Sequence, residues 1–179
     1  MLESFRRSIG FQLARFHFRK NPDSVITFTE AISDARQALL IMPLGHMQLL
    51  PTVIVIELLK KRFREENITI VTADGGHEVM RLLPHSPVVR ILPTEVSVFF
   101  LPRHELVERV NKRTYDVAID LNLDLLLPSA YICKESRARV RVGFAGKQAD
   151  TFYNLQIKQD PAQSKQMVFD RLAKCLEMF

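Results

Sequence analysis

The residues best suited to chemistry stand where predicted strands end. Asp120, Asn122 and Asp124 follow directly after the apolar run Val117–Ile119. Two carboxyl groups could work as general acid and general base if they lay close together. No histidine or third carboxylate stands near them, so the simpler interpretation is structural, with an aspartate that caps a helix or organises the loop. Asp120 and Asp124 therefore remain candidates for catalysis and for a loop scaffold, and we expect Asn122 to line a ligand crevice at the end of the strand.

A second group of candidates lies in the loop after the apolar run 38–42. This loop contains Gly45, His46 and Gln48. His46 could act as a base because histidine titrates near neutral pH, although a loop histidine more often makes only surface contacts. Gln48 cannot be a base, because an amide does not accept a proton at neutral pH. We expect Gly45 and Gln48 to line a ligand crevice.

A glycine pair follows the predicted strand 68–72. Gly75 and Gly76 would let the backbone approach a ligand closely and would present the amides of the next helix to a phosphate. The alternative is a tight turn that needs positive φ. The spacing matches neither GxGxxG nor a P-loop. Lys147, in the loop after the predicted strand 139–144, is expected at the same crevice, either solvated or in contact with ligand.

The elements that position these residues alternate between strand and helix. Predicted strands cover 37–43, 68–72, 88–92, 115–121 and 139–144, and predicted helices include 48–64, 103–113 and 160–179. Runs that are apolar throughout indicate strands buried on both faces of a parallel sheet, whose carboxyl ends form the ligand crevice. We predict the α/β class, with one Rossmann-like domain over residues 22–179 and an amphipathic helix over 1–21.

The segment 96–101 is unusually apolar, with Phe99 and Phe100 adjacent before Pro102. It could be the end of another strand, or an exposed loop that meets a partner.

The amino-terminal helix has two apolar strips at helical spacing. The larger consists of Leu2, Phe5, Ile9, Leu13 and Phe16. Arginines fan out around it: Arg6, Arg7, Arg15 and Arg19. Phe11 and Phe18 lie opposite. The helix could lie in an anionic membrane surface, or it could pack on its own domain or on a partner subunit. Two apolar strips favour packing between two surfaces.

Composition restricts the function further. Residues 1–20 contain five basic side chains against one acidic side chain, which is +4 of the net charge of +5. The rest of the chain is nearly neutral, which disfavours nucleic-acid binding. Cys133 and Cys175 lack CxxC spacing, so no metal site is predicted and both thiols should be reduced. With no run of about 18 apolar residues and no signal peptide, we expect a cytoplasmic protein that could also rest on the inner membrane.

The order of several segments resembles a known family. QALLIMPLG, ELLKKRF, ITIVT, EVMRLLP, YDVAIDL and RVRVGFAGK, spread over residues 37–153, resemble the amino-terminal half of ADP-heptose:lipopolysaccharide heptosyltransferases. These are family-nine glycosyltransferases of the GT-B fold. The resemblance implies an acceptor-side domain in which the region of Lys147 faces the acceptor. It also implies a catalytic aspartate in a Gly-Asp pair, but the matching positions here are Met47 and Gln48.

The resemblance and its departures give two leading hypotheses. In the resembled enzymes a second Rossmann-like domain binds most of the nucleotide-sugar, and the sequence ends where that domain would begin. We therefore expect a non-catalytic interaction or scaffold module, a pseudoenzyme without cofactor. It would form a homo-oligomer or dock on another subunit, and could bind an anionic membrane. The alternative is the acceptor-binding half of a split glycosyltransferase acting on lipopolysaccharide or another cell-envelope glycan. A third reading is nucleotide binding at Gly75 and Gly76.

Overall fold

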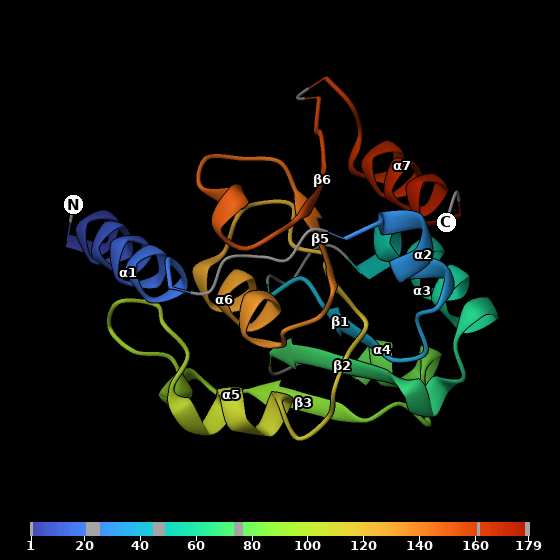
Figure 1. The fold of residues 1–179 in the computed structure, drawn as a ribbon, viewed down its shortest axis with the longest axis horizontal. Coiled ribbons are helices and arrows are strands. Elements are labelled where there is room, and N and C mark those ends of the chain that lie inside the picture. The colour runs from blue at the N-terminus through green and yellow to red at the C-terminus, as the bar shows by residue number, and fades with distance from the viewer. Residues whose placement is uncertain (1, 21–25, 45–48, 74–76, 161, 178–179) are drawn as a thin grey trace.

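The computed structural model describes residues 2–20, 26–44, 49–73, 77–160 and 162–177. Within them lies a six-stranded sheet in the order β3-β2-β1-β4-β5-β6 (Figure 1). Its strands are β1 (Ala38–Ile41), β2 (Ile68–Ala73), β3 (Val88–Ile91), β4 (Val117–Asp120), β5 (Val140–Phe144) and β6 (Leu155–Ile157). All five strand pairs are parallel. This is the doubly wound order of Rossmann-like domains, which confirms the predicted fold class.

The pairing of the central strands shows where the expected ligand crevice of the sheet lies. β1 pairs with β2 through Leu40 and Ile70 and with β4 through Leu40 and Ile119. The chain winds outward from β1 in one direction and from β4 in the other, so the two strands flank the point where the order reverses. Ligands of such sheets bind outside the carboxyl ends of these two strands. Asp120 is the last residue of β4 and therefore lies at this point.

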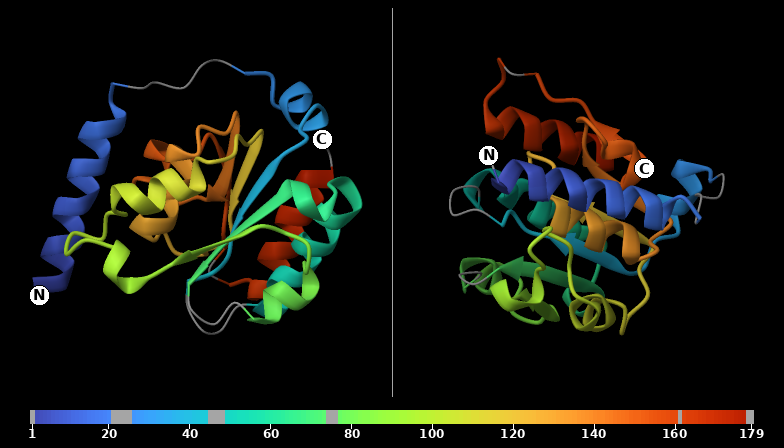
Figure 2. Two further views of the ribbon diagram at one scale, coloured as in Figure 1. Left: turned by 90° about the horizontal axis from the view of Figure 1, so that it is seen from below. Right: turned by 90° about the vertical axis from the view of Figure 1, so that its left-hand side faces the viewer.

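Helices cover both faces of the sheet (Figure 2). One face packs against α2 (Phe28–Ser33), α3 (Leu49–Arg62), α4 (His77–Leu82) and α7 (Lys165–Glu177). The other carries α5 (His104–Val110), α6 (Leu127–Glu135) and α1 (Leu2–Phe18), with α6 between α1 and the sheet. In β1, Leu40 faces the first core and Leu39 the second, which is the alternation expected of a strand buried on both sides.

Two segments differ from the sequence-based expectation. β6 was not predicted, because it has only three residues, one of them polar, and it only extends the sheet beyond β5. The segment 96–101 is no strand of the sheet; a single bridge joins Val96 to Pro102, and Phe100 adopts a φ of 63°. It does meet a partner, but that partner is α1 of the same chain: the guanidinium carbon of Arg7 lies 5.4 Å from the centroid of the Phe100 ring.

Candidate functional site

The carboxylate of Asp120 is the centre of a buried polar network at the switch point. Its side chain has no exposed surface. One oxygen accepts hydrogen bonds from the Asn122 backbone N–H at 3.0 Å and from the Asn122 side-chain amide at 2.7 Å. The other accepts from the hydroxyl of Tyr153 at 2.7 Å. Two loops that follow different strands therefore converge on one carboxylate.

Asn122 ties the ends of β1 and β4 together. Its Oδ1 accepts a hydrogen bond from the Leu44 N–H at 2.9 Å, and its Nδ2 donates to the Met42 carbonyl at 3.3 Å as well as to Asp120. A side-chain amide has two N–H donors, and both are used here. The residue predicted to line a ligand crevice is thus 6% exposed and fully engaged as a donor within the protein.

Burial controls the electrostatics of this network. It raises the pKa of Asp120, against the opposing effect of hydrogen bonds from Asn122, Tyr153 and Ser129. Burial also raises the pKa of Tyr153 well above its usual value, and the negative charge of Asp120 raises it further. The Tyr153 hydroxyl consequently remains a protonated donor at any physiological pH. The arrangement favours a fixed structural hydrogen bond.

Gly143 of β5 makes room for Tyr153. A Cβ atom at position 143 would lie 2.5 Å from the Tyr153 ring, closer than a real contact permits. The ring therefore rests directly on the strand backbone and brings its hydroxyl to Asp120. Neither residue was singled out from the sequence. A glycine inside a predicted strand often marks such a close approach, and that signal could have identified the position.

The remaining predicted site residues do not join this network. Asp124 is exposed whereas Asp120 is buried, so the two carboxyl groups do not share an environment. Lys147 is exposed and lines a shallow cavity of about 500 Å³ with residues of α1, including Arg7 and Phe11. The other candidates, Gly45, His46, Gln48, Gly75 and Gly76, lie outside the described residues, as does Met47. No group of three potential metal ligands occurs in the part of the chain that the structure describes.

The inner face of α1 is fixed to the domain by its small residues. Gly10 and Ala14 are buried, and a Cβ on Gly10 would lie 2.0 Å from the Phe99 carbonyl oxygen and 2.7 Å from Leu127. Phe18, from the predicted minor strip, is buried against the rings of Tyr131 and Phe152, with centroid distances of 4.9 and 5.9 Å. The minor strip is therefore the one that packs on the domain.

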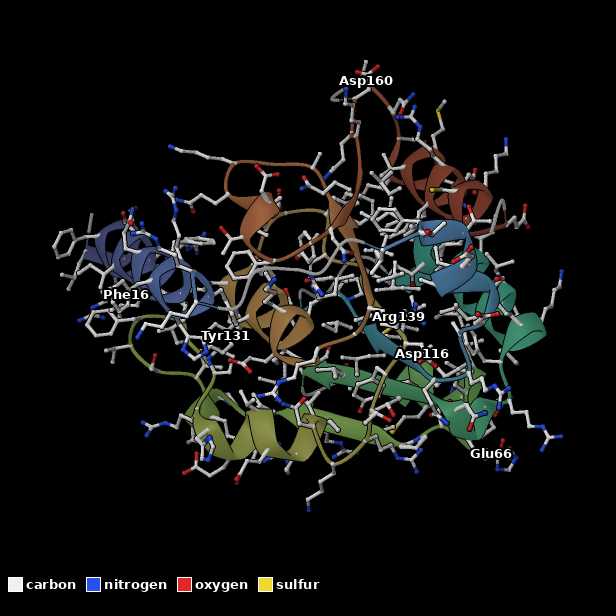
Figure 3. The ribbon with its side chains drawn as sticks, in the orientation of Figure 1. Phe16, Glu66, Asp116, Tyr131, Arg139 and Asp160 are labelled. Carbon is white, nitrogen blue, oxygen red and sulfur yellow. The ribbon has the colours of Figure 1, made fainter. Side chains whose placement is uncertain are left out.

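The outer face of α1 carries the larger of the two predicted apolar strips, and this face is exposed. Four of its large apolar side chains have exposed fractions of 47 to 68%: Leu2, Phe5, Leu13 and Phe16. Ile9 is half-buried. The flanking cations Arg6, Arg15 and Arg19 are exposed, and Arg7 forms an ion pair with Glu3 at 3.1 Å. Figure 3 labels Phe16 on α1 at the periphery of the molecule. None of the helices described is long and apolar enough to cross a membrane.

Comparisons with known proteins agree with the fold. A family model described as "Family of unknown function (DUF6913)" matches residues 55–179. No curated protein matches the chain. A solved glycosyl transferase family 9 structure from Veillonella parvula is similar with a TM-score of 0.59 and 18% identity, over 80% of this chain and 42% of that one.

Escherichia coli heptosyltransferase WaaC gives the same result. Its complex with ADP matches with a TM-score of 0.56 and 15% identity over 78% of this chain and 46% of that one. Its complex with ADP-2-deoxy-2-fluoro heptose matches with a TM-score of 0.57 and 16% identity over 80% and 49%. The chain thus spans less than half the length of these enzymes. The resemblance to family-nine glycosyltransferases drawn from the sequence is confirmed as a likeness of fold.

Proposed function

The chain belongs to the DUF6913 family, and we propose that it is a non-catalytic interaction module that docks on an anionic membrane surface through the outer face of α1. One observation carries this proposal: α1 is apolar on two faces, and only one of them is covered. Gly10, Ala14 and Phe18 hold the helix to the domain, so the helix is presented in a fixed orientation. The opposite, exposed face of α1 is then directed away from the domain, where another surface could contact it.

The buried network supports the non-catalytic part. A general base must come within hydrogen-bond reach of the proton that it removes. Asp120 has no exposed surface and already accepts three hydrogen bonds from Asn122 and Tyr153. Gln48 stands where the resembled enzymes carry their aspartate, and an amide is no base. These groups fit a scaffold at the switch point better than a site of sugar transfer.

The charges around the exposed strip favour a membrane over a second copy of the chain. Arg6, Arg15 and Arg19 border the strip, and the single acid of the helix, Glu3, is engaged by Arg7. A symmetric dimer through this strip would bring like charges together, which is unfavourable. At an anionic lipid surface each such cation contributes about 1 kcal/mol. Each large apolar side chain adds up to about 1.5–3 kcal/mol if it becomes fully buried.

Vesicle binding tests the proposal. The full chain should co-sediment with phosphatidylglycerol-containing vesicles and bind neutral phosphatidylcholine vesicles much more weakly. The double variant Phe5→Gln/Phe16→Gln should lose binding yet stay folded, since both side chains are exposed. Met167→Gln, a change at an exposed apolar residue of α7, is the matched control and should bind normally. A chain that ignores anionic vesicles but forms oligomers that the double variant disrupts would replace the membrane by a second copy.

The acceptor-binding half of a split glycosyltransferase is the second candidate. It is favoured by the likeness to enzymes of which the chain spans 42 to 49%. It predicts that the purified protein binds heptose or a lipid A precursor, or supports transfer when the missing half is supplied. Sugar transfer by the chain itself would overturn the non-catalytic proposal whatever the result with vesicles.

A further inference from the structure

A basic groove lies on the side of the domain away from the Asp120 network. It has a volume of about 980 Å³ and runs between α5, α6 and the last turn of α1. Its residues include the segment just before β5, at the amino-terminal end of that strand, whereas Asp120 ends β4 at the opposite edge of the sheet. Figure 3 labels two of its members, Tyr131 on α6 and Arg139 before β5. The volume is that of a small-molecule site.

The groove has an excess of positive charge. Four basic side chains line it: Lys134, Arg137, Arg139 and Arg141. Its two carboxylates are already occupied, because Glu135 lies 2.7 Å from the Nε2 atom of His17 and Glu108 lies 3.2 Å from that of His104. Both carboxylates therefore contact histidine side chains at the wall of the groove. The field inside the groove favours an anion.

Two of the four guanidinium and ammonium groups are available to a ligand. Arg137 and Arg139 are exposed, and no other described residue forms a hydrogen bond or ion pair with either guanidinium group. They lie two positions apart in the turn between α6 and β5, and both line the groove. Beneath them Arg141 is 4% exposed and is held by the carbonyls of Ala138 at 2.8 Å and Phe152 at 3.0 Å. One buried, hydrogen-bonded guanidinium group and two exposed ones therefore line the same groove.

Arg137 occupies a backbone position that suits glycine. It follows the end of α6 with a φ of 56°, and its N–H donates to the Lys134 carbonyl. Glycine is the usual residue at this place after a helix, because other residues are strained in the left-handed region. The chain thus carries strain at the point where an arginine side chain enters the groove. Such strain is commonly found at binding sites.

We propose that this groove binds the phosphate groups of a small ligand, as a phosphate monoester or a diphosphate. Guanidinium groups present paired N–H donors that match phosphate oxygens, and such charge-assisted bonds are the strong ones. The two free arginines supply these donors, and Arg141 and Lys134 supply further positive charge. The site is independent of the vesicle binding proposed for α1, because none of its four cations belongs to that helix.

Calorimetric titration with pyrophosphate tests the groove. Arg139→Gln should weaken binding about tenfold or more, the effect of losing one charge-assisted hydrogen bond. Arg137→Gly should weaken binding similarly while raising the melting temperature, because it removes a ligand donor and relieves backbone strain together. Lys165→Gln removes an exposed cation from α7, far from the groove, and should leave binding unchanged.

Three results would overturn the site: no heat with pyrophosphate, normal binding by both arginine variants, or an equal loss in Lys165→Gln. The source of the phosphate is resolved by competition. Pyrophosphate that displaces the chain from phosphatidate vesicles would assign the groove to a lipid headgroup. Pyrophosphate binding that the vesicles do not affect would assign it to a soluble phosphate ester. The Phe5→Gln/Phe16→Gln variant should titrate like the parent chain, so failure of the α1 proposal would not affect this one.

Discussion

The hydroxyl of Tyr153 donates a hydrogen bond of 2.7 Å to the carboxylate of Asp120, across 33 positions of sequence. This bond joins the segment after η3 (Ala149–Thr151) to the end of β4. Since Asn122 completes the network from the other side, the polar residues at the switch point are bound to one another. The stability of the fold should therefore depend on side chains that the sequence first suggests as chemical groups.

Removal of the Tyr153 hydroxyl tests this dependence. Tyr153→Phe takes a donor from a buried carboxylate and should lower the free energy of unfolding by about 1.5–3 kcal/mol. Tyr115→Phe is the matched control, because Tyr115 is also buried but donates to the neutral carbonyl of Val110; its cost should be nearer about 1 kcal/mol. Urea denaturation measures both. Equal costs would mean that Asp120 gains nothing special from Tyr153.

The buried carboxyl group should make stability depend on pH. Because burial raises the pKa of folded Asp120 above its ordinary value of 3.8, the protonated form is favoured in the folded state. The protonated Asp120 side chain contributes to the free energy of unfolding below pH 3.8, and this contribution is lost as the pH rises through the pKa of Asp120 in the folded state. Asp120→Asn should remove this loss. Urea denaturation across that pH range should show a flatter profile for the variant, and an unchanged profile would contradict the assignment.

Glu95 should change the pH dependence of the free energy of unfolding in the opposite direction, by stabilising the fold above its pKa. A hydrogen bond from Arg109 lowers the pKa of Glu95 below its ordinary value of 4.5. This stabilisation is present above pH 4.5 and is lost as the pH falls through the folded pKa. Glu95→Gln should therefore lose less stability on acidification than the parent chain. Glu66→Gln, at an exposed glutamate, is the control and should follow the parent profile.

The packing of α1 against the domain can be tested by substituting two glycines. Gly10→Ala places a Cβ 2.0 Å from the Phe99 carbonyl oxygen, and such overpacking should cost about 1–3 kcal/mol. The amides of α1 should then exchange faster with solvent, since the helix must move away from the domain. Gly146→Ala has nothing within 4 Å of its new Cβ and should leave both quantities unchanged. Slow exchange in Gly10→Ala would show that α1 packs differently.

Much of the fold could be predicted from local patterns. Val117, Ala118 and Ile119 form an apolar run between polar residues, and they are buried in β4 as expected. The alternative reading of Asp120 as a residue that organises its loop agrees with its hydrogen bonds. β6 could not be predicted, because Leu155–Ile157 is too short to show a period and becomes a strand only by pairing with β5.

The sequence by itself determined that a parallel α/β sheet would form and that α1 would have two apolar strips, because burial of apolar side chains follows their spacing. Only the tertiary structure decided which strip faces inward. That choice depends on shape: Gly10 and Ala14 let the helix approach Phe99 and Leu127, while Phe5 and Phe16 would hold it away. The Tyr153 bond to Asp120 and the groove before β5 are likewise contacts between distant segments, which no local pattern contains.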